Sequence, residues 1–448
     1  MSRVPPDGTL RVVAWGDGPF WSNWAGTADA RPQLFASPAS VAQLQTVVRE
    51  AAARGLRVKA LGSGHSFTPI AVTDGVAVRL GRLTGILRAD IEAGLVTVLA
   101  GTTLHELGER LWALGLAMEN LGDIDGQTVA GAISTGTHGT GARFGGLATQ
   151  VRGLRLVLAD GTLLDCSAEQ NPDVFAAARI GLGALGVIAT VTLQCVPAFL
   201  LHATEAPGLL GDVLDGFDEL AAANDHAEFY WFPHTRRVLT KRNNHSRGPA
   251  RPLGRLRRAI DDEFLSNTVF EWTNRLCAAR PSMIPRVNAL AARALSAREY
   301  VDRSYRVFAS PRRVVFREME YAVPRKAARH VLTEIDGWLR RSGEHIAFPV
   351  EVRVTAADDV WLSTAYQRDS AYIAVHQHVR RDHRAYFDAV EQIARSVGGR
   401  PHWGKLHSLD AARLRETYPR FDDFVAVRDR LDPDRRFANL HLRQILGP

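Results

Sequence analysis

Ala60-Leu-Gly-Ser-Gly-His-Ser-Phe67 is a glycine-rich stretch that continues a short strand-like run, Arg57-Val-Lys-Ala-Leu61. Before that run, residues 38–54 repeat apolar side chains at helical spacing, with Ser37 as a start signal and Gly55 as a stop signal. The pattern predicts a helix, then a strand, then an open loop. Glycines at the end of a strand let backbone amides approach a ligand closely, so we expect a binding loop at residues 62–67.

A second glycine-rich run follows, Gly122-Asp-Ile-Asp-Gly-Gln-Thr-Val-Ala-Gly-Ala-Ile-Ser-Thr-Gly-Thr-His-Gly-Thr-Gly141. Between the two runs, residues 95–100 read as a strand, and Thr103 with Glu106 forms a capping box at the start of a helix. Further on, Asp160-Gly161 joins two strand-like segments as a hairpin turn. Together the two glycine-rich runs predict a site whose exposed amides hold a pyrophosphate.

Gly181-Leu-Gly-Ala-Leu-Gly186 matches the dinucleotide fingerprint GxGxxG letter for letter. That fingerprint must follow a strand and open a helix, whereas here a helical pattern comes before it and a β-branched run after it. We therefore expect helix-to-strand packing or contact with another nucleotide instead of a nicotinamide site. The uncharged stretch 181–201 is long enough to span a membrane, but its glycines, Pro197 and β-branched residues favour a buried strand.

The chain has 448 residues and a net charge of +7, and only four of its 55 basic residues are lysines. Basic clusters at residues 236–237, 241–242, 255–258 and 312–313 are interspersed with acidic residues, which favours solvated faces over nucleic-acid binding. Three cysteines without CxxC spacing exclude a disulfide framework. The first ten residues lack the apolar core of a signal peptide. We expect a cytoplasmic protein without a membrane span.

Pro197 and Pro207 indicate a domain boundary, and strand-like segments at 228–232, 314–321, 347–354 and 372–379 predict a second, sheet-based domain. In the run Pro349-Val-Glu-Val-Arg-Val-Thr355, Glu351 and Arg353 share one face of the strand. That pair is either a solvated ion pair or a catalytic acid and base. His376 and His378 also share a strand face, but no HExxH motif or suitably spaced carboxylate accompanies them, so we expect no metal site.

The two glycine-rich runs, together with His402-Trp-Gly-Lys405, resemble the aldonolactone oxidoreductases. These are the gulonolactone and arabinonolactone oxidases, within the vanillyl-alcohol-oxidase type of flavoproteins. Three further stretches carry the same resemblance: His226-Ala-Glu-Phe-Tyr-Trp-Phe-Pro-His234, Glu351-Val-Arg353 and Arg436-Phe-Ala-Asn-Leu-His-Leu442. Their order and spacing cover nearly the whole chain.

The resemblance implies an α+β fold with a two-subdomain FAD-binding domain at residues 1–198. A substrate-binding cap on an antiparallel sheet is expected at 199–425, and a return to the flavin domain at 426–448. The implied cofactor is FAD, bound covalently through His65. The implied FAD-binding residues are Gly62, Ser63, Gly64, Ser66, Phe67, Gly122, Asp123, Thr128, Gly131, Ser134, Thr135, Thr137, His138, Gly139, Gly186, Val187, Ile188, Asn439 and His441.

The implied reaction is oxidation of an aldono-1,4-lactone by hydride transfer to flavin N5. The catalytic residues would be Glu351, Arg353 and Lys405, and Asp123, His376 and His402 would line the substrate pocket. An alditol oxidase is the alternative within enzymes. A basic protein that binds nucleic acid or a membrane surface is the alternative of another class. Gly122 corresponds to a position where a side chain obstructs oxygen, so we expect O2 as acceptor and hydrogen peroxide as product.

Overall fold

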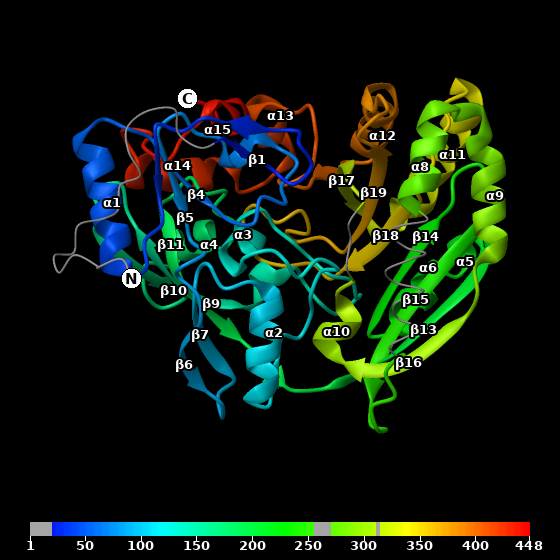
Figure 1. Cartoon of the computed structure of the whole chain (residues 1–448), viewed down its shortest axis with the longest axis horizontal. Helices are drawn as coiled ribbons and strands as arrows, with labels where there is room; N and C mark the ends of the chain where they lie inside the picture. Colours follow the sequence, from blue (N-terminus) through cyan, green and yellow to red (C-terminus); the bar gives the residue numbers. More distant parts are fainter. Residues whose placement is uncertain (1–19, 255–269, 311–313) are drawn as a thin grey trace, which may run out of the picture.

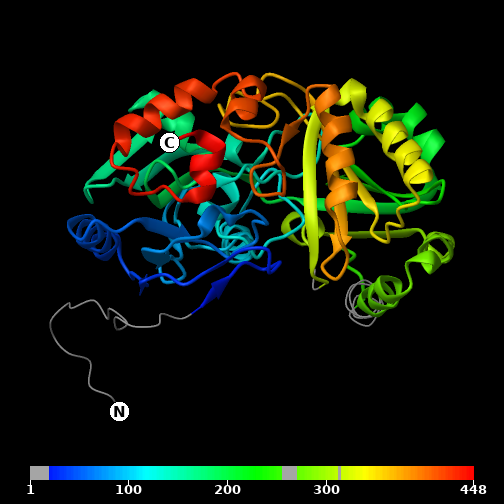
Figure 2. The ribbon, with the colours of Figure 1, turned by 90° about the horizontal axis from the view of Figure 1, so that it is seen from above.

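A computed structural model of the chain describes residues 20–254, 270–310 and 314–448. Two halves lie side by side, each built on its own sheets, and the C-terminal helices lie over the first half (Figure 1; Figure 2). The expected α+β class, with an antiparallel sheet in the second half, is confirmed.

The first sheet is parallel and consists of β3 (Leu34–Ala36), β5 (Val76–Arg79) and β4 (Val58–Leu61), in that order. The predicted helix before β4 is α1 (Val41–Ala53), which buries Leu44, Val47 and Val48. Its N-cap is Ser40, not the predicted Ser37, because the Ser40 hydroxyl accepts from the Gln43 N–H at 3.2 Å. The glycine-rich loop 62–67 leaves the end of β4, as the sequence predicts.

The second sheet is antiparallel, in the order β10-β9-β11-β7-β6. Its strands are β6 (Ile86–Asp90), β7 (Leu95–Leu99), β9 (Val151–Val157), β10 (Leu163–Ser167) and β11 (Val187–Gln194). Thr103 caps α2 (Leu104–Ala113) by accepting from the Glu106 N–H at 3.1 Å, which confirms the capping box. The Asp160-Gly161 hairpin is confirmed by the pairing of β9 with β10.

The uncharged stretch 181–201 holds a loop and the buried central strand β11, preceded by α4 (Pro172–Ala178). The helix-before, strand-after order around Gly181 and Gly186 is therefore confirmed. No helix among the described residues combines the length and the apolarity that crossing a bilayer requires.

The second half carries an antiparallel sheet of eight strands in the order β16-β13-β15-β14-β18-β19-β17-β20. They are β13 (Leu200–Leu209), β14 (His226–Trp231), β15 (Arg237–Ser246), β16 (Arg298–Arg303), β17 (Phe316–Pro324), β18 (Val350–Thr355), β19 (Ser370–His378) and β20 (Arg400–Pro401). The four segments predicted as strands correspond to β14, β17, β18 and β19.

The two faces of this sheet differ in chemistry because side chains alternate along each strand. On the outer face, Met319, Val352 and Ile373 pack against α11 (Ala328–Ser342) and α12 (Arg384–Ser396) in one apolar core. On the inner face, the same strands present charged side chains toward the first half. The alternation of Glu351 and Arg353 with valines is confirmed.

The remaining elements are short: β1 (Trp21–Ser22), β2 (Asp29–Ala30), η1 (Pro69–Ala71), β8 (Leu116–Ala117), α3 (Val129–Ser134), η2 (Leu147–Gln150), β12 (Val196–Pro197), α5 (Leu210–Asp215), α6 (Phe217–Ala222), α8 (Phe270–Ala279), η4 (Pro281–Met283), α9 (Ile284–Ala294), α10 (Ser304–Phe308), η5 (Arg325–Ala327), α13 (Ala411–Thr417), α14 (Phe421–Leu431) and α15 (Leu440–Leu446).

Two boundary expectations change. Pro207 lies inside β13 and not at a domain boundary. Strand β15 pairs with β13 along residues 200–209, whereas β16 pairs only with residues 200–205. Proline is tolerated at position 207 because one edge of β13 is unpaired there. The chain also returns to the first half earlier than residue 426. Trp403, Leu409 and Phe424 already belong to the core of the first half, since their apolar side chains are buried there.

Asn439 anchors the C-terminal return and generates a stability prediction. Its Nδ2 donates to the carbonyls of Pro69, Ile70 and Val72 at 2.8–3.1 Å, while its Oδ1 caps α15 by accepting from the Leu442 N–H. We expect Asn439→Ala to lower the free energy of unfolding by about 2–4 kcal/mol, because a cap and several buried acceptors lose their partner.

Urea denaturation checks this value. Asp410→Ala is the matched control, because Asp410 caps α13, also of seven residues, and makes no such tie to another segment. We expect the control to lose only about 1 kcal/mol. Equal losses in the two variants would contradict the anchoring role of Asn439.

Candidate functional site

The first cavity, here called the glycine-lined cavity, has a volume of about 1030 Å³ including its open mouth. Its wall combines the 62–66 loop, the start of α3 and the 181–186 loop. Predicted residues in its lining are Gly62, Ser63, Gly64, His65, Ser66, Thr128, Gly131, Ser134, Thr135, Gly186 and Ile188. The three glycine-rich motifs therefore meet at one site.

The 62–66 loop leaves backbone amides available to an anion. The backbone N–H groups of Ser63, Gly64, His65 and Ser66 donate no hydrogen bond to any described residue. Gly64 has φ +74°, which favours glycine. A Cβ on Gly62 would lie 2.9 Å from Thr128 Oγ1, so the bare Cα preserves the space. Free amides around a cavity of this size suit the pyrophosphate of FAD.

The second cavity, here called the charged cavity, has a volume of about 750 Å³ and lies between the first half and the inner face of the cap sheet. Predicted residues in its lining are His65, Ser66, Phe67, Gly122, Asp123, Thr135, Thr137, His138, Glu351, Arg353, His376, His402 and Lys405. His65, Ser66 and Thr135 line both cavities, so the two spaces meet at the 62–67 loop. Burial, aided by the charge of Lys405, lowers the pKa of His65, which favours its neutral form.

Arg353 is the centre of the charged cavity. Its Nε donates to Glu228 Oε2 at 2.8 Å, and its Nη2 pairs with Glu351 and lies 3.4 Å from Asp123 Oδ2. Burial alone would lower the pKa of Arg353, but these three carboxylates outweigh it and raise the pKa well above its usual value. Arg353 is therefore a permanent buried cation with a fixed orientation.

Lys405 is the second cation of the cavity. It pairs with Glu318, and its Nζ lies 5.1 Å from the centre of the Phe67 ring. Burial opposes its charge, but Glu318 and Glu320 raise the pKa of Lys405 above its usual value. Lys405 thus remains an ammonium at neutral pH. It suits stabilisation of a developing alkoxide better than proton abstraction.

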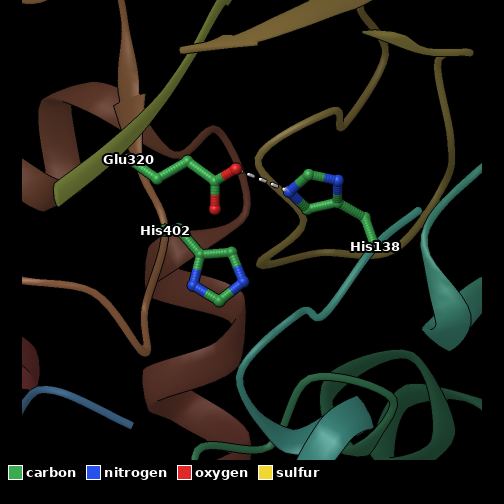
Figure 3. A group of neighbouring side chains, drawn as sticks. All are labelled: His138, Glu320 and His402. Atoms are coloured by element: carbon green, nitrogen blue, oxygen red, sulfur yellow. Dashed lines mark hydrogen bonds and ion pairs between the residues drawn. The ribbon is translucent and has the colours of Figure 1, made fainter. Parts of the chain in front are cut away.

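His138, Glu320 and His402 form a buried cluster (Figure 3). Glu320 and His402 are also close enough to Lys405 to interact with its charge. His138 Nδ1 lies 2.8 Å from the Gly139 carbonyl, and its Nε2 lies 3.2 Å from Glu320 Oε1. Burial lowers the pKa of His402 to about 4. Its Nδ1 accepts from the Gly404 N–H at 3.0 Å, so the hydrogen of the neutral ring is on Nε2. In this arrangement neither nitrogen of His402 has a free lone pair.

Four predicted residues lie outside both linings. Gly139 packs closely, since an added Cβ would come within 2.3 Å of the Leu121 carbonyl. Val187 belongs to the core, and the amide of Asn439 is occupied by the contacts described above. His441 is half-buried near Lys59. These four residues therefore lie behind the lining of the two cavities.

Three acidic residues of the site were not predicted: Glu228, Glu318 and Glu320. The signal was present, because Glu318 and Glu320 alternate with apolar residues along β17 as Glu351 and Arg353 do along β18. Burial alone would raise the pKa of Glu228, but Arg353 and Lys241 lower it to about 2. All three carboxylates therefore stay ionised and help to hold the two cations.

Arginines elsewhere on the surface pair with local carboxylates, as in Arg236 with Asp336 and Arg329 with Asp215. These surface ion pairs agree with the expectation that the basic clusters lie on solvated faces. The clusters at 255–258 and 312–313, like residues 1–10, lie outside the described residues.

Family comparisons agree with this geometry. The family described as D-arabinono-1,4-lactone oxidase matches residues 191–445, and the FAD binding domain family matches residues 32–167. An L-gulono-1,4-lactone dehydrogenase of Mycobacterium tuberculosis is 46% identical over 433 residues, 96% of this chain and 100% of that protein. The L-gulonolactone oxidase of Bos taurus is 36% identical, over 96% of this chain and 98% of that protein.

Solved structures with the same fold are more distant. Cholesterol oxidase from Brevibacterium sterolicum superposes with a TM-score of 0.82 at 18% identity, over 99% of both chains. A chitooligosaccharide oxidase superposes with a TM-score of 0.71 at 16% identity, over 96% of both chains. These neighbours show the fold.

Proposed function

Because the chain belongs to the aldonolactone oxidoreductase family, we propose that it oxidises an aldono-1,4-lactone with FAD held in the glycine-lined cavity. The observation that carries this proposal is the junction of the two cavities at His65, next to the buried cations Arg353 and Lys405. FAD supplies the hydride acceptor at N5. The charged cavity supplies the binding site for the substrate hydroxyls.

We assign a separate role in alcohol oxidation to each of three residues of the charged cavity. A carbon that gives up hydride must also lose its hydroxyl proton, which would pass to solvent water in the cavity mouth, so negative charge develops on the oxygen. Lys405 contacts that oxygen and stabilises the charge. Arg353 offers its N–H groups to the substrate oxygen or to the reduced cofactor, and Glu351 orients Arg353 and accepts from substrate hydroxyls. The buried setting strengthens each of these contacts.

Anaerobic titration of the purified enzyme tests the function. We expect gulono- or arabinono-1,4-lactone to bleach the flavin absorption, while xylitol and sorbitol leave it unchanged. Bleaching by the alditols alone would make the enzyme an alditol oxidase. A protein without flavin absorption would contradict the FAD assignment and favour the binding-protein alternative.

We propose that His65 holds FAD covalently. Its imidazole is mainly neutral and lies where the two cavities meet, so a ring nitrogen could bond to the methyl carbon of a flavin ring. The methyl group would lose a proton to solvent, and the flavin, reduced by two electrons as the bond forms, would be reoxidised by O2. We expect acid-precipitated protein to stay yellow and His65→Ala to release its flavin. Release of all colour from the unmodified protein would exclude the linkage.

Lys405→Met tests the alkoxide-stabilising role. We expect anaerobic flavin reduction by the lactone to slow about 100- to 1,000-fold, because one charge-assisted contact to the transition state is lost. FAD content should change far less. Lys326→Met is the control, since Lys326 is exposed in η5. A near-normal reduction rate in Lys405→Met would remove this lysine from the reaction.

We propose O2 as the electron acceptor, with Gly122 keeping its path open. Gly122 lines the charged cavity and has no positive φ, so the turn itself does not need glycine. An added Cβ would lie 3.1 Å from the His138 carbonyl, so the alanine variant requires a shift of a few tenths of an ångström there. The names of the relatives include both a dehydrogenase and an oxidase, and reoxidation must be measured.

We expect the reduced enzyme to reoxidise in air with release of hydrogen peroxide, and Gly122→Ala to slow that step while lactone reduction continues. Gly81→Ala is the matched control, because a methyl there meets nothing within 4 Å. An enzyme that stays reduced in air, and turns over only with artificial acceptors, would be a dehydrogenase.

We also propose a cytoplasmic location, since Cys166, Cys195 and Cys277 are all buried free thiols.

A further inference from the structure

Lys59 is a buried lysine that the proposed mechanism does not use. It lies in β4, three residues before the 62–66 loop, and is only 3% exposed. Among the residues that line the glycine-lined cavity, it is the one lysine, and no arginine, aspartate or glutamate lines that cavity. A cavity suited to a doubly negative diphosphate therefore contains a single formally charged side chain.

Two backbone carbonyls hold the amine of Lys59 in place. Its Nζ donates to the Gly183 carbonyl at 3.2 Å and to the Phe437 carbonyl at 3.0 Å. A protonated lysine has three N–H donors, so these two contacts leave one donor for a ligand. The contacts also tie β4 to the 181–186 loop and to the C-terminal return.

We infer that Lys59 is the cation that balances the diphosphate of FAD, and that it takes up a proton when FAD binds. This inference rests on the proposal that FAD occupies the glycine-lined cavity. An unbalanced ammonium in an apolar site is costly, whereas the same ammonium beside a diphosphate is stabilised by a strong charge interaction. The ligand therefore supplies the charge that makes the protonated form favourable.

The surroundings of Lys59 agree with a neutral amine before FAD binds. Burial lowers the pKa of Lys59 to about 7, although Asp432 raises it in part. Burial raises the pKa of Asp432 itself, and its oxygens accept from the Arg436 and Phe437 N–H groups. His441, also close to Lys59, is neutral because burial lowers its pKa to about 3. The value of about 7 already includes the attraction of Asp432, so at pH 8 the amine of Lys59 in the empty cavity is mostly unprotonated.

Calorimetric titration of FAD into the full-length His65→Ala protein, stripped of cofactor, tests the inference without a covalent bond. Titrations at pH 8 in buffers of different ionisation enthalpy count the protons. We expect uptake of about one proton per FAD. When Lys59→Met is combined with His65→Ala, proton uptake should vanish. The Kd for FAD should rise about 10- to 100-fold, because a charged hydrogen bond is lost. Lys326→Met, in the same background, should match its parent.

Lys59→Arg keeps the test decisive if Lys59→Met does not fold. Arginine stays protonated, so this variant should bind FAD without proton uptake. Absence of uptake with Lys59 intact, or equal uptake in Lys59→Arg, would overturn the inference. A Kd within about twofold of the parent in folded Lys59→Met would do the same. Failure of FAD to bind with Lys59 intact would overturn the proposed cofactor site. Binding of FAD without proton uptake would overturn only the inference about Lys59.

Discussion

The buried guanidinium of Arg353 is the interaction on which the rest of the site depends. A charge without water must be compensated, and removing one partner from such a cluster is strongly destabilising. Glu228 and Glu351 come from the cap sheet, whereas Asp123 comes from the second glycine-rich run of the first half. The compensation of Arg353 thus joins the two halves. Backbone pairing beside it, from the Gly141 N–H to the Val354 carbonyl at 2.8 Å, fixes the same contact.

The contact between the two halves places the glycine-lined cavity next to the charged cavity. The glycine-lined cavity offers free amides and one lysine, which suits a diphosphate. The charged cavity offers oriented cations and ionised carboxylates, which suits a polyhydroxylated lactone. Because His65 lines both, a flavin ring that reaches it lies between its phosphates and the substrate. Residues of the glycine-lined cavity are therefore expected to bind FAD, and residues of the charged cavity to bind the substrate.

Much of this arrangement follows from local sequence patterns. The cap of α2, the Asp160-Gly161 turn and the alternation along β18 are local features, and the structure confirms them. The start of α1 was misplaced because Ser37 and Ser40 both precede the apolar pattern, and only the hydrogen bond from the Gln43 N–H to the Ser40 hydroxyl identifies Ser40 as the cap.

Contacts across the chain were harder to predict. The acidic partners Glu228 and Glu318 lie on strands that pairing brings beside β18 and the 402–405 turn, and a single sequence does not reveal strand order. Asn439 was assigned to the cofactor by resemblance, whereas its hydrogen bonds show an anchor for residues 69–72. Most residues that the resemblance assigns to the site line the two adjoining cavities, and only the contacts separate them from the residues that lie behind the lining.

A crystal structure of the FAD-loaded enzyme is the most direct test of the proposal that FAD passes from the glycine-lined cavity to the charged cavity at His65. It should show the diphosphate against the amides of residues 63–66, the flavin ring beside His65, and the reactive edge of that ring facing Arg353 and Lys405. A flavin ring found elsewhere, with the charged cavity separated from it by protein, would contradict the proposed site.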